Sequence, residues 1–268
     1  MAHPADRFLQ LGTLDALAGG ASPIHRLDPR AKVLAVAGLV VAVASFGRFE
    51  VAALLPYALF PAVLLTLGAI PGGYILRRML AALPFVLALG LLNPVLDRAP
   101  MLQLGPVTVS AGWLSLASIL VRFALTVGTA LLLVATTPFH QVCMALEKLG
   151  LPRVFALQLA FLYRYAFVLA AETARLVRAR SLRAFGRRLS LGEFTGLAGG
   201  LLLRTWDRAQ RIHTAMLARA FTGDFQPREP LAWNSRDTLF TLGWLGLFAA
   251  LRWARLPQLL GQLAGGAQ

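Results

Sequence analysis

Two arginines stand between small residues near the predicted ends of two long helices. The triplets are Ala179-Arg180-Ser181 and Ala218-Arg219-Ala220. Small neighbours allow another protein to approach closely, and a planar guanidinium pairs bidentately with a carboxylate or binds exposed carbonyls at a helix terminus. The repeated triplet therefore predicts docking to a protein partner, although helices rich in alanine and arginine also contain such triplets by chance.

The other reactive residue types form no catalytic pattern. The 12 Asp and Glu residues are scattered, without the clustered acids that hold Mg²⁺ on phosphates in membrane transferases. The only lysines, Lys32 and Lys148, follow no glycine-rich phosphate loop, and the single cysteine, Cys143, excludes an internal disulfide. The histidines are far apart in the chain: His3, His25, His140 and His213. We therefore expect no catalytic residues, no metal and no cofactor on this chain, with a membrane-embedded transferase and a stand-alone metal permease as rival classes.

Composition places these residues in a membrane protein. Of the 268 residues 57% are hydrophobic and 14% charged, against about 25% charged in soluble domains. Apolar runs separated by turn-like or charged breaks predict an all-α, polytopic integral membrane protein of about five transmembrane helices. The runs are Val33 to Phe46, Val51 to Ile70, Met79 to Leu96, Gly112 to Ala135 and Thr238 to Leu251.

The basic residues orient these spans. Clusters before the first span, after the second and after the fourth all fall on one side, which the positive-inside rule assigns to the cytoplasm. Arg252 and Arg255 after the last span count against this scheme. Arg122 within the fourth run is either functional or a snorkelling structural residue, and the structural interpretation is favoured.

A basic segment interrupts the membrane pattern. Between Lys148 and Arg236 there are 15 Lys and Arg against 5 Asp and Glu, which is +10 of the net +14. Two amphipathic helices are predicted there, from Arg153 to about Phe185 and from about Leu191 to Phe221. This charge suits a cytoplasmic module at a lipid or protein surface rather than nucleic-acid binding. The sequence thus divides into residues 1–136 with four spans, 137–236 with long cytoplasmic amphipathic coupling helices, and 237–268 with the last span.

At these residues the sequence resembles the transmembrane T component of energy-coupling factor (ECF) transporters, of the CbiQ cobalt-transport type. The stretch His25 to Lys32 resembles the family's amino-terminal "DPR-x-K" motif, carried by Asp28, Pro29, Arg30 and Lys32. The two arginine triplets resemble the X-Arg-X signatures of the family. The second lies in Thr214 to Phe221, which is close to "AMLARGF" but has Ala220 where glycine is usual.

The resemblance implies a scaffold that joins a substrate-binding membrane subunit to two ABC-type ATPase subunits. Arg180 and Arg219 would then enter grooves of the ATPases, and ATP with Mg²⁺ would be bound by those partners. The implied cargo is cobalt(II), with nickel and a vitamin such as biotin as alternatives, because the substrate-binding part is a separate chain. The implied location is the inner membrane, with the N-terminus and coupling module in the cytoplasm.

Overall fold

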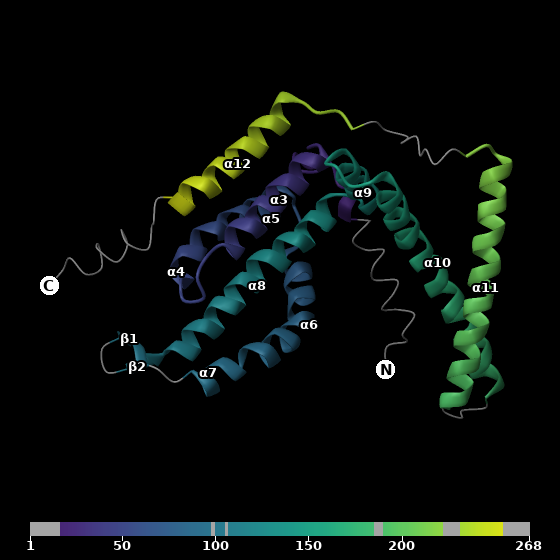
Figure 1. The fold of residues 1–268 in the computed structure, drawn as a ribbon, viewed down its shortest axis with the longest axis horizontal. Helices are drawn as coiled ribbons and strands as arrows, with labels where there is room; N and C mark the ends of the chain where they lie inside the picture. The colour runs from purple at the N-terminus through teal and green to yellow at the C-terminus, as the bar shows by residue number, and fades with distance from the viewer. Residues whose placement is uncertain (1–16, 98–99, 105–106, 185–189, 222–230, 254–268) are drawn as a thin grey trace. The chain divides into compact units, whose positions relative to one another are not determined.

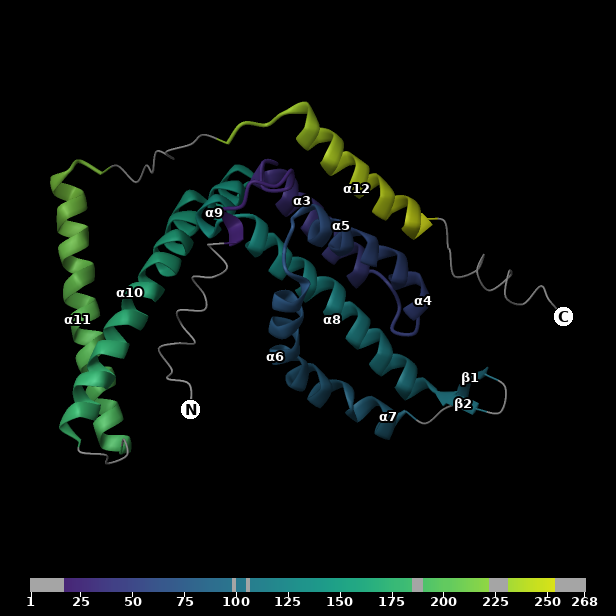
Figure 2. The ribbon, with the colours of Figure 1, turned by 180° about the vertical axis from the view of Figure 1, so that it is seen from behind.

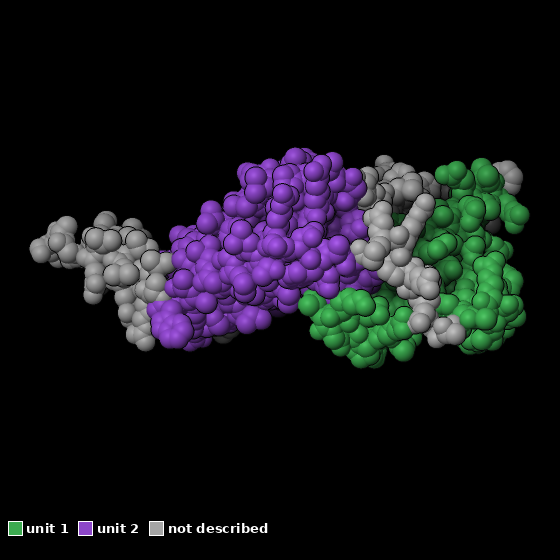
Figure 3. Space-filling view, turned by 90° about the horizontal axis from the view of Figure 1, so that it is seen from above, with its two compact units in different colours: residues 1–14, 146–230 green, residues 15–145, 231–268 purple. Residues whose placement is uncertain are grey.

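The computed structural model describes residues 17–97, 100–104, 107–184, 190–221 and 231–253 (Figures 1 and 2). The chain divides into two compact units, which we describe separately (Figure 3). The hairpin unit comprises residues 1–14 and 146–230, and the bundle unit comprises residues 15–145 and 231–268.

The bundle unit is built from helices of very different lengths. In chain order they are α3 (Pro29–Ala44), α4 (Val51–Leu54), the 3₁₀ turn η1 (Leu55–Ala58), α5 (Leu59–Leu67), α6 (Gly72–Gly90), α7 (Leu92–Leu96), α8 (Ala111–Thr136), α9 (Phe139–Lys148), which reaches the border of the unit, and α12 (Ser235–Trp253). Between α7 and α8 the strands β1 (Pro100–Leu104) and β2 (Val107–Ser110) pair antiparallel. This hairpin was not predicted from the sequence.

Helix α3 packs between α8 and α12, and α8 runs antiparallel to it (Figure 1). At one end, Lys32 Nζ of α3 donates to the carbonyl of Thr136, the last residue of α8. Toward the other end, Arg122 of α8 donates to the carbonyl of Phe46, just beyond α3. Helix α6 lies along α8 and is also antiparallel to it.

Helix α12 runs parallel to α3. Asp237 in its first turn accepts a hydrogen bond from the backbone N–H of Asp28, and Arg252 in its last turn donates to the carbonyl of Ser45. Residues more than 200 positions apart in the sequence therefore hold these two helices together at both ends. Helices α3 and α12 thus run in one direction and α8 in the opposite direction, as the predicted order of the spans requires.

Aromatic rings from three segments fill the core around Phe248. Tyr57 stacks on Phe248 with ring centroids 5.7 Å apart, and Phe60 meets Phe248 edge-on at 5.5 Å and Trp244 at 4.8 Å. The Tyr57 hydroxyl donates to the Phe248 carbonyl at 3.1 Å, which satisfies its polar end inside the bundle. Such ring pairs bind α12 to the short helices η1 and α5.

Three helices are long and apolar enough to cross a membrane: Gly72–Pro94, Ala111–Thr136 and Arg153–Arg183. The continuous helical stretch Val51–Leu67, made of α4, η1 and α5, is apolar but shorter. By this measure the described residues do not reach the predicted count of five, because α3 has only 16 residues and α12 carries Arg236, Asp237 and Arg252. The third helix was assigned from its charge to the cytoplasmic module. The chain is an all-α polytopic membrane protein, and the number of its spans stays a prediction.

The hairpin unit consists mainly of two long antiparallel helices, α10 (Arg153–Arg183) and α11 (Leu191–Ala218) (Figure 2). Both begin and end close to the predicted positions. Pro152 precedes α10, where its missing N–H needs no partner. Helix α11 exposes large apolar side chains, of which Leu202, Leu203 and Trp206 are 69%, 68% and 64% accessible. These side chains leave an apolar surface that this unit does not cover by itself.

Candidate functional site

Ionic contacts align the two helices of the hairpin unit. Glu172 of α10 pairs with Arg175 of its own helix at 2.6 Å and with Arg204 of α11 at 3.0 Å. At the turn, Ser190 and Glu193 form a capping box: the Ser190 hydroxyl accepts from the Glu193 N–H, and the Glu193 carboxylate accepts from the Ser190 N–H. The start of α11 is therefore fixed beside the end of α10.

Arg180 lies in the last turn of α10 and pairs with Glu193. Its side chain is only 17% accessible, whereas the neighbouring Ala179 and Ser181 are exposed. The Ser190 N–H, together with the Arg180 guanidinium, holds the pKa of Glu193 below its usual range, so Glu193 is ionised at neutral pH. Arg180 is thus held at the surface in a fixed position rather than extended into solvent.

Arg219 forms the C-cap of α11, and the whole triplet Ala218 to Ala220 is exposed. Ala220 follows in the left-handed region with φ of 51°. Its N–H donates to the Leu217 carbonyl, and the Phe221 N–H donates to the Met216 carbonyl at 3.0 Å. These bonds define a Schellman motif, in which the left-handed position is usually glycine. The helix therefore ends in a tight turn that presents Arg219 at its tip.

We expect Ala220→Gly to stabilise this turn. Left-handed backbone costs alanine about 1–2 kcal/mol, and glycine avoids this cost although it loses more chain entropy on folding. Hydrogen exchange of the Phe221 amide should slow about two- to fivefold. The matched control Ala218→Gly, in regular helix, should speed it. Unchanged exchange in Ala220→Gly would mean that the turn is not strained.

The two arginine triplets do not come together. Arg180 is placed by Glu193 at the start of α11, and Arg219 lies 26 residues further along the same helix. At 1.5 Å per residue the two guanidinium groups sit about 40 Å apart. The hairpin unit therefore carries its two arginine triplets at well-separated positions.

The amino-terminal motif forms the first turn of α3. Asp28 is the N-cap, and its carboxylate accepts from the Arg30 N–H at 2.8 Å, while Pro29 occupies the first helical position. The Arg30 guanidinium binds both oxygens of the same carboxylate, at 3.1 and 2.9 Å. Asp28 itself is 5% accessible. Charged side chains are rarely buried so deeply unless they are paired, so Asp28 is part of the packed interior and is not a solvated helix cap.

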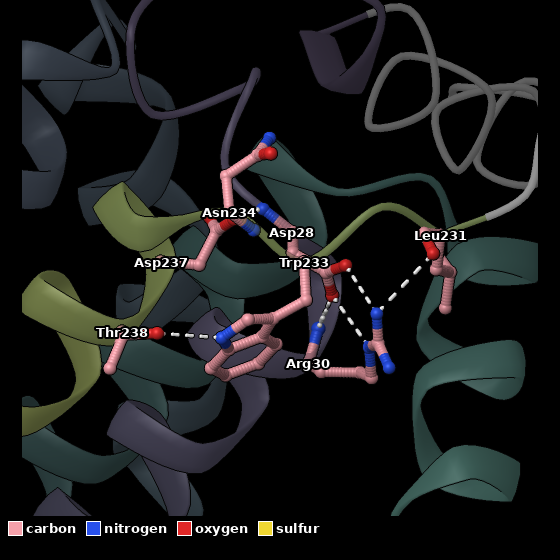
Figure 4. Close-up of polar contacts among 7 residues, drawn as sticks. All are labelled: Asp28, Arg30, Leu231, Trp233, Asn234, Asp237 and Thr238. Atoms are coloured by element: carbon pink, nitrogen blue, oxygen red, sulfur yellow. Dashed lines mark hydrogen bonds and ion pairs between the residues drawn. The ribbon is translucent and has the colours of Figure 1, made fainter.

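Asp28 is buried because the start of α12 lies against it (Figure 4). One oxygen of Asp237 accepts from the Asp28 N–H and the other from the Asn234 N–H, both at 2.8 Å. Arg30 continues the network: its guanidinium donates to the Leu231 carbonyl at 3.4 Å and lies 5.4 Å from the centre of the Trp233 ring. The contacts of Asp237 and Trp233 with this motif were not predicted from the sequence.

Lys32 is the last residue of the amino-terminal motif. Its side chain is buried, at 2% accessibility, and Nζ donates to the Thr136 carbonyl at 3.1 Å. Carbonyls at a helix C-terminus carry partial negative charge, which suits a buried ammonium. The charges of Asp28 and Asp237 also act on it.

Two further arginines fasten the opposite end of α3. Arg122 donates to the carbonyls of Phe46 and Gly47, at 3.1 and 2.6 Å. Arg252 donates to the Ser45 carbonyl at 3.1 Å and lies 4.5 Å from the Phe46 ring centre. The Ser45 carbonyl belongs to the C-cap of α3, and the carbonyls of Phe46 and Gly47 lie just beyond it. Arg122 and Arg252 therefore tie α8 and α12 to the segment at the end of α3, and the role predicted for Arg122 stays a prediction.

No metal centre is evident in the part of the chain that the structure describes. Its His, Cys, Asp and Glu residues form no group of three that could hold an ion. Cys143 is buried, and His25 bonds the Ser22 hydroxyl and the Leu17 carbonyl at 2.7 and 3.0 Å. His3 lies outside the described residues.

A helical bundle interrupted by a basic helical hairpin defines the class: a polytopic α-helical membrane protein. More particularly, the chain belongs to the CbiQ family of cobalt transport proteins, whose model matches residues 20–230. It is 27% identical to the cobalt transport protein CbiQ of Salmonella typhimurium over 54% of this chain and 70% of that protein. It is also 27% identical to an ECF transporter transmembrane protein, EcfT, of Heliobacterium modesticaldum, over 85% and 91%.

A third relative is a longer protein. The fused cobalt transport protein CbiMQ of Methanocorpusculum labreanum, described as putative, is 31% identical over 34% of this chain, and the match spans only 16% of that protein. The relatives are thus membrane components of transporters, and none of the names quoted above is that of an enzyme.

Proposed function

We propose that this chain is the coupling subunit of an ATP-driven ECF-type importer in the inner membrane. It would transmit the movement of two ABC ATPase subunits, which bind ATP and Mg²⁺, to a substrate-binding membrane subunit. Arg180 and Arg219 are the contacts with the ATPases in this proposal. The relatives named as ECF transporter transmembrane proteins support this role.

The spacing of the two arginines is the observation that carries the proposal. Arg180 and Arg219 have similar small neighbours but lie at opposite ends of α11. Two equal contact points about 40 Å apart suit two copies of one partner better than a single binding groove. The exposed apolar side chains Leu202, Leu203 and Trp206 lie between them along the helix and supply surface for burial on docking.

Charge supports the cytoplasmic placement of this unit. The +10 excess between Lys148 and Arg236 favours the cytoplasmic side, where ATP is available. Cobalt(II) is the proposed cargo because the family is one of cobalt transport proteins. Nickel and biotin remain the alternatives for a complex whose substrate-binding subunit is another chain.

Co-purification from native membranes tests this function. In mild detergent, the tagged chain should bring down two ABC ATPase copies and a small membrane protein. The complex in liposomes should take up radiolabelled cobalt(II) only when ATP is present inside the compartment that holds the ATPases, and competition with nickel and biotin would identify the cargo. A chain that purifies without any ATPase, or uptake that needs no ATP, would contradict the proposal.

A further inference from the structure

An open apolar groove lies between the two helices of the hairpin unit. Helices α10 and α11 meet at their shared turn and diverge toward the start of α10 (Figures 1 and 2). The ion pairs Arg180–Glu193 and Glu172–Arg204 join them on the side of the turn. Beyond these pairs the helices leave a groove of about 370 Å³. This volume falls within the range of sites that bind small molecules.

Each helix contributes one face to the groove, with lining residues at helical spacing. They include Tyr165 and Leu169 of α10 and Arg208, Ile212, His213 and Met216 of α11. Among the described residues that line it, Arg208 is a cation and none is an acid. The exposed apolar side chains that we assign to partner docking, Leu202, Leu203 and Trp206, do not line the groove. The groove is therefore a separate surface.

The α10 side of the groove belongs to the apolar half of that helix. Arg164 is the only charged residue between positions 154 and 171, whereas positions 172–183 hold five charged residues. Helix α10 is long and apolar enough to cross a membrane, and only 6% of its most apolar window is buried inside the structure. Such a surface needs an apolar environment. We therefore expect the groove to open onto lipid.

Arg208 gives the groove a charged end and an apolar end. Because the helices are antiparallel, Arg208 lies toward Leu169 and the charged half of α10, and Met216 lies toward the apolar start of α10. Arg208 is exposed and forms no ion pair with an acid in the described part of the chain. A phospholipid has the same polarity, because its phosphate stays at the membrane surface and its acyl chains enter the hydrocarbon.

We propose that the groove between α10 and α11 binds an anionic phospholipid. One acyl chain lies between the helices, in contact with Leu169, Ile212 and Met216, and the phosphate binds Arg208. The +10 charge of the segment from Lys148 to Arg236 adds to this attraction for anionic lipid. The lipid fills the space where the helices diverge. This inference goes beyond the proposed function and does not depend on it.

Lipid retention by the full chain tests the site. The chain is purified in mild detergent and mixed with equal amounts of phosphatidylglycerol and phosphatidylcholine, and native mass spectrometry counts the lipids that it retains. Wild type should prefer phosphatidylglycerol, and Arg208→Gln should lower retention of this lipid about fivefold. Arg211→Gln, which removes an exposed arginine outside the groove lining, is the matched control and should change it less than about twofold. Equal retention of the two lipids by wild type, or no effect of Arg208→Gln, would refute the proposal.

Cross-linking locates the bound lipid. A photoreactive phenylalanine analogue in place of Ile212 should, on irradiation in native membranes, become attached to an anionic phospholipid. Ala209→Trp fills the groove and should reduce this product at least about threefold. Ala215→Trp adds the same bulk at an exposed position outside the lining and should not reduce it. Attachment to a protein, or the absence of any lipid product, would show that lipid is not the occupant.

Discussion

The double variant Arg180→Ala with Arg219→Ala is expected to lose ATPase association and uptake almost completely. Removing an arginine from a protein groove leaves the partner's charge or carbonyls unsatisfied, which costs about 3–5 kcal/mol for a buried pair. Each single variant should weaken ATPase association strongly. Neither arginine should compensate for the loss of the other, because the two contacts lie at opposite ends of α11. Lysine at either position should rescue poorly, since it keeps the charge but lacks the planar fork. Association is measured by co-purification and uptake in liposomes.

Three controls separate this role from a structural one. Arg178→Ala and Arg211→Ala remove exposed arginines from α10 and α11 and should cost only about 0–1 kcal/mol of binding. Glu193→Gln breaks the ion pair of Arg180 but leaves the arginine itself. If Glu193→Gln abolished ATPase association as fully as Arg180→Ala, Arg180 would act only by holding α10 and α11 together and not by contacting the ATPase. Normal association of the double variant would refute the coupling assignment.

Gly112→Ala is expected to give the largest loss of stability in the bundle. A methyl group at this position, at the start of α8, would lie 2.4 Å from the Asn93 carbonyl oxygen and 2.5 Å from Pro94 Cα. Backbone atoms cannot turn away as a flexible side chain can, so α7 must shift and its Asn93 bond to Ser115 is strained. We expect a cost of about 1–3 kcal/mol, seen as a fall of about 3–10 °C in the thermal midpoint in detergent.

Gly246→Ala is the matched control for this prediction. A methyl group at Gly246, in the middle of α12, would have nothing within 4 Å. Alanine favours helix over glycine by about 0.5–1 kcal/mol, so this variant should be neutral or slightly more stable. A Gly112→Ala protein as stable as wild type would show that α7 and α8 do not pack as closely as the structure has them.

Local patterns were sufficient to predict most helices and the family. The ends of α8, α10 and α11 follow from apolar runs, from Pro152 and from charge, because helix boundaries depend on residues a few positions apart. The capping box of Ser190 and Glu193 has the same local character and was readable as Ser-x-x-Glu, although it was not used. The short hairpin of β1 and β2 was missed, although the sequence has the turn-marking dipeptide Gly105-Pro106 between the two strands.

The sequence by itself determined that this is a helical membrane protein with a basic inserted hairpin and two arginines between small residues. Only the tertiary structure decided which charges meet. Asp28 and Asp237 are 209 residues apart, and Lys32 and Thr136 are 104 apart. No periodicity links such positions, because their contact depends on how α3, α8 and α12 pack. Burial then decides what surrounds each charge: Lys32 is buried and bonds the last carbonyl of α8, because α3 and α8 pack with these two ends together.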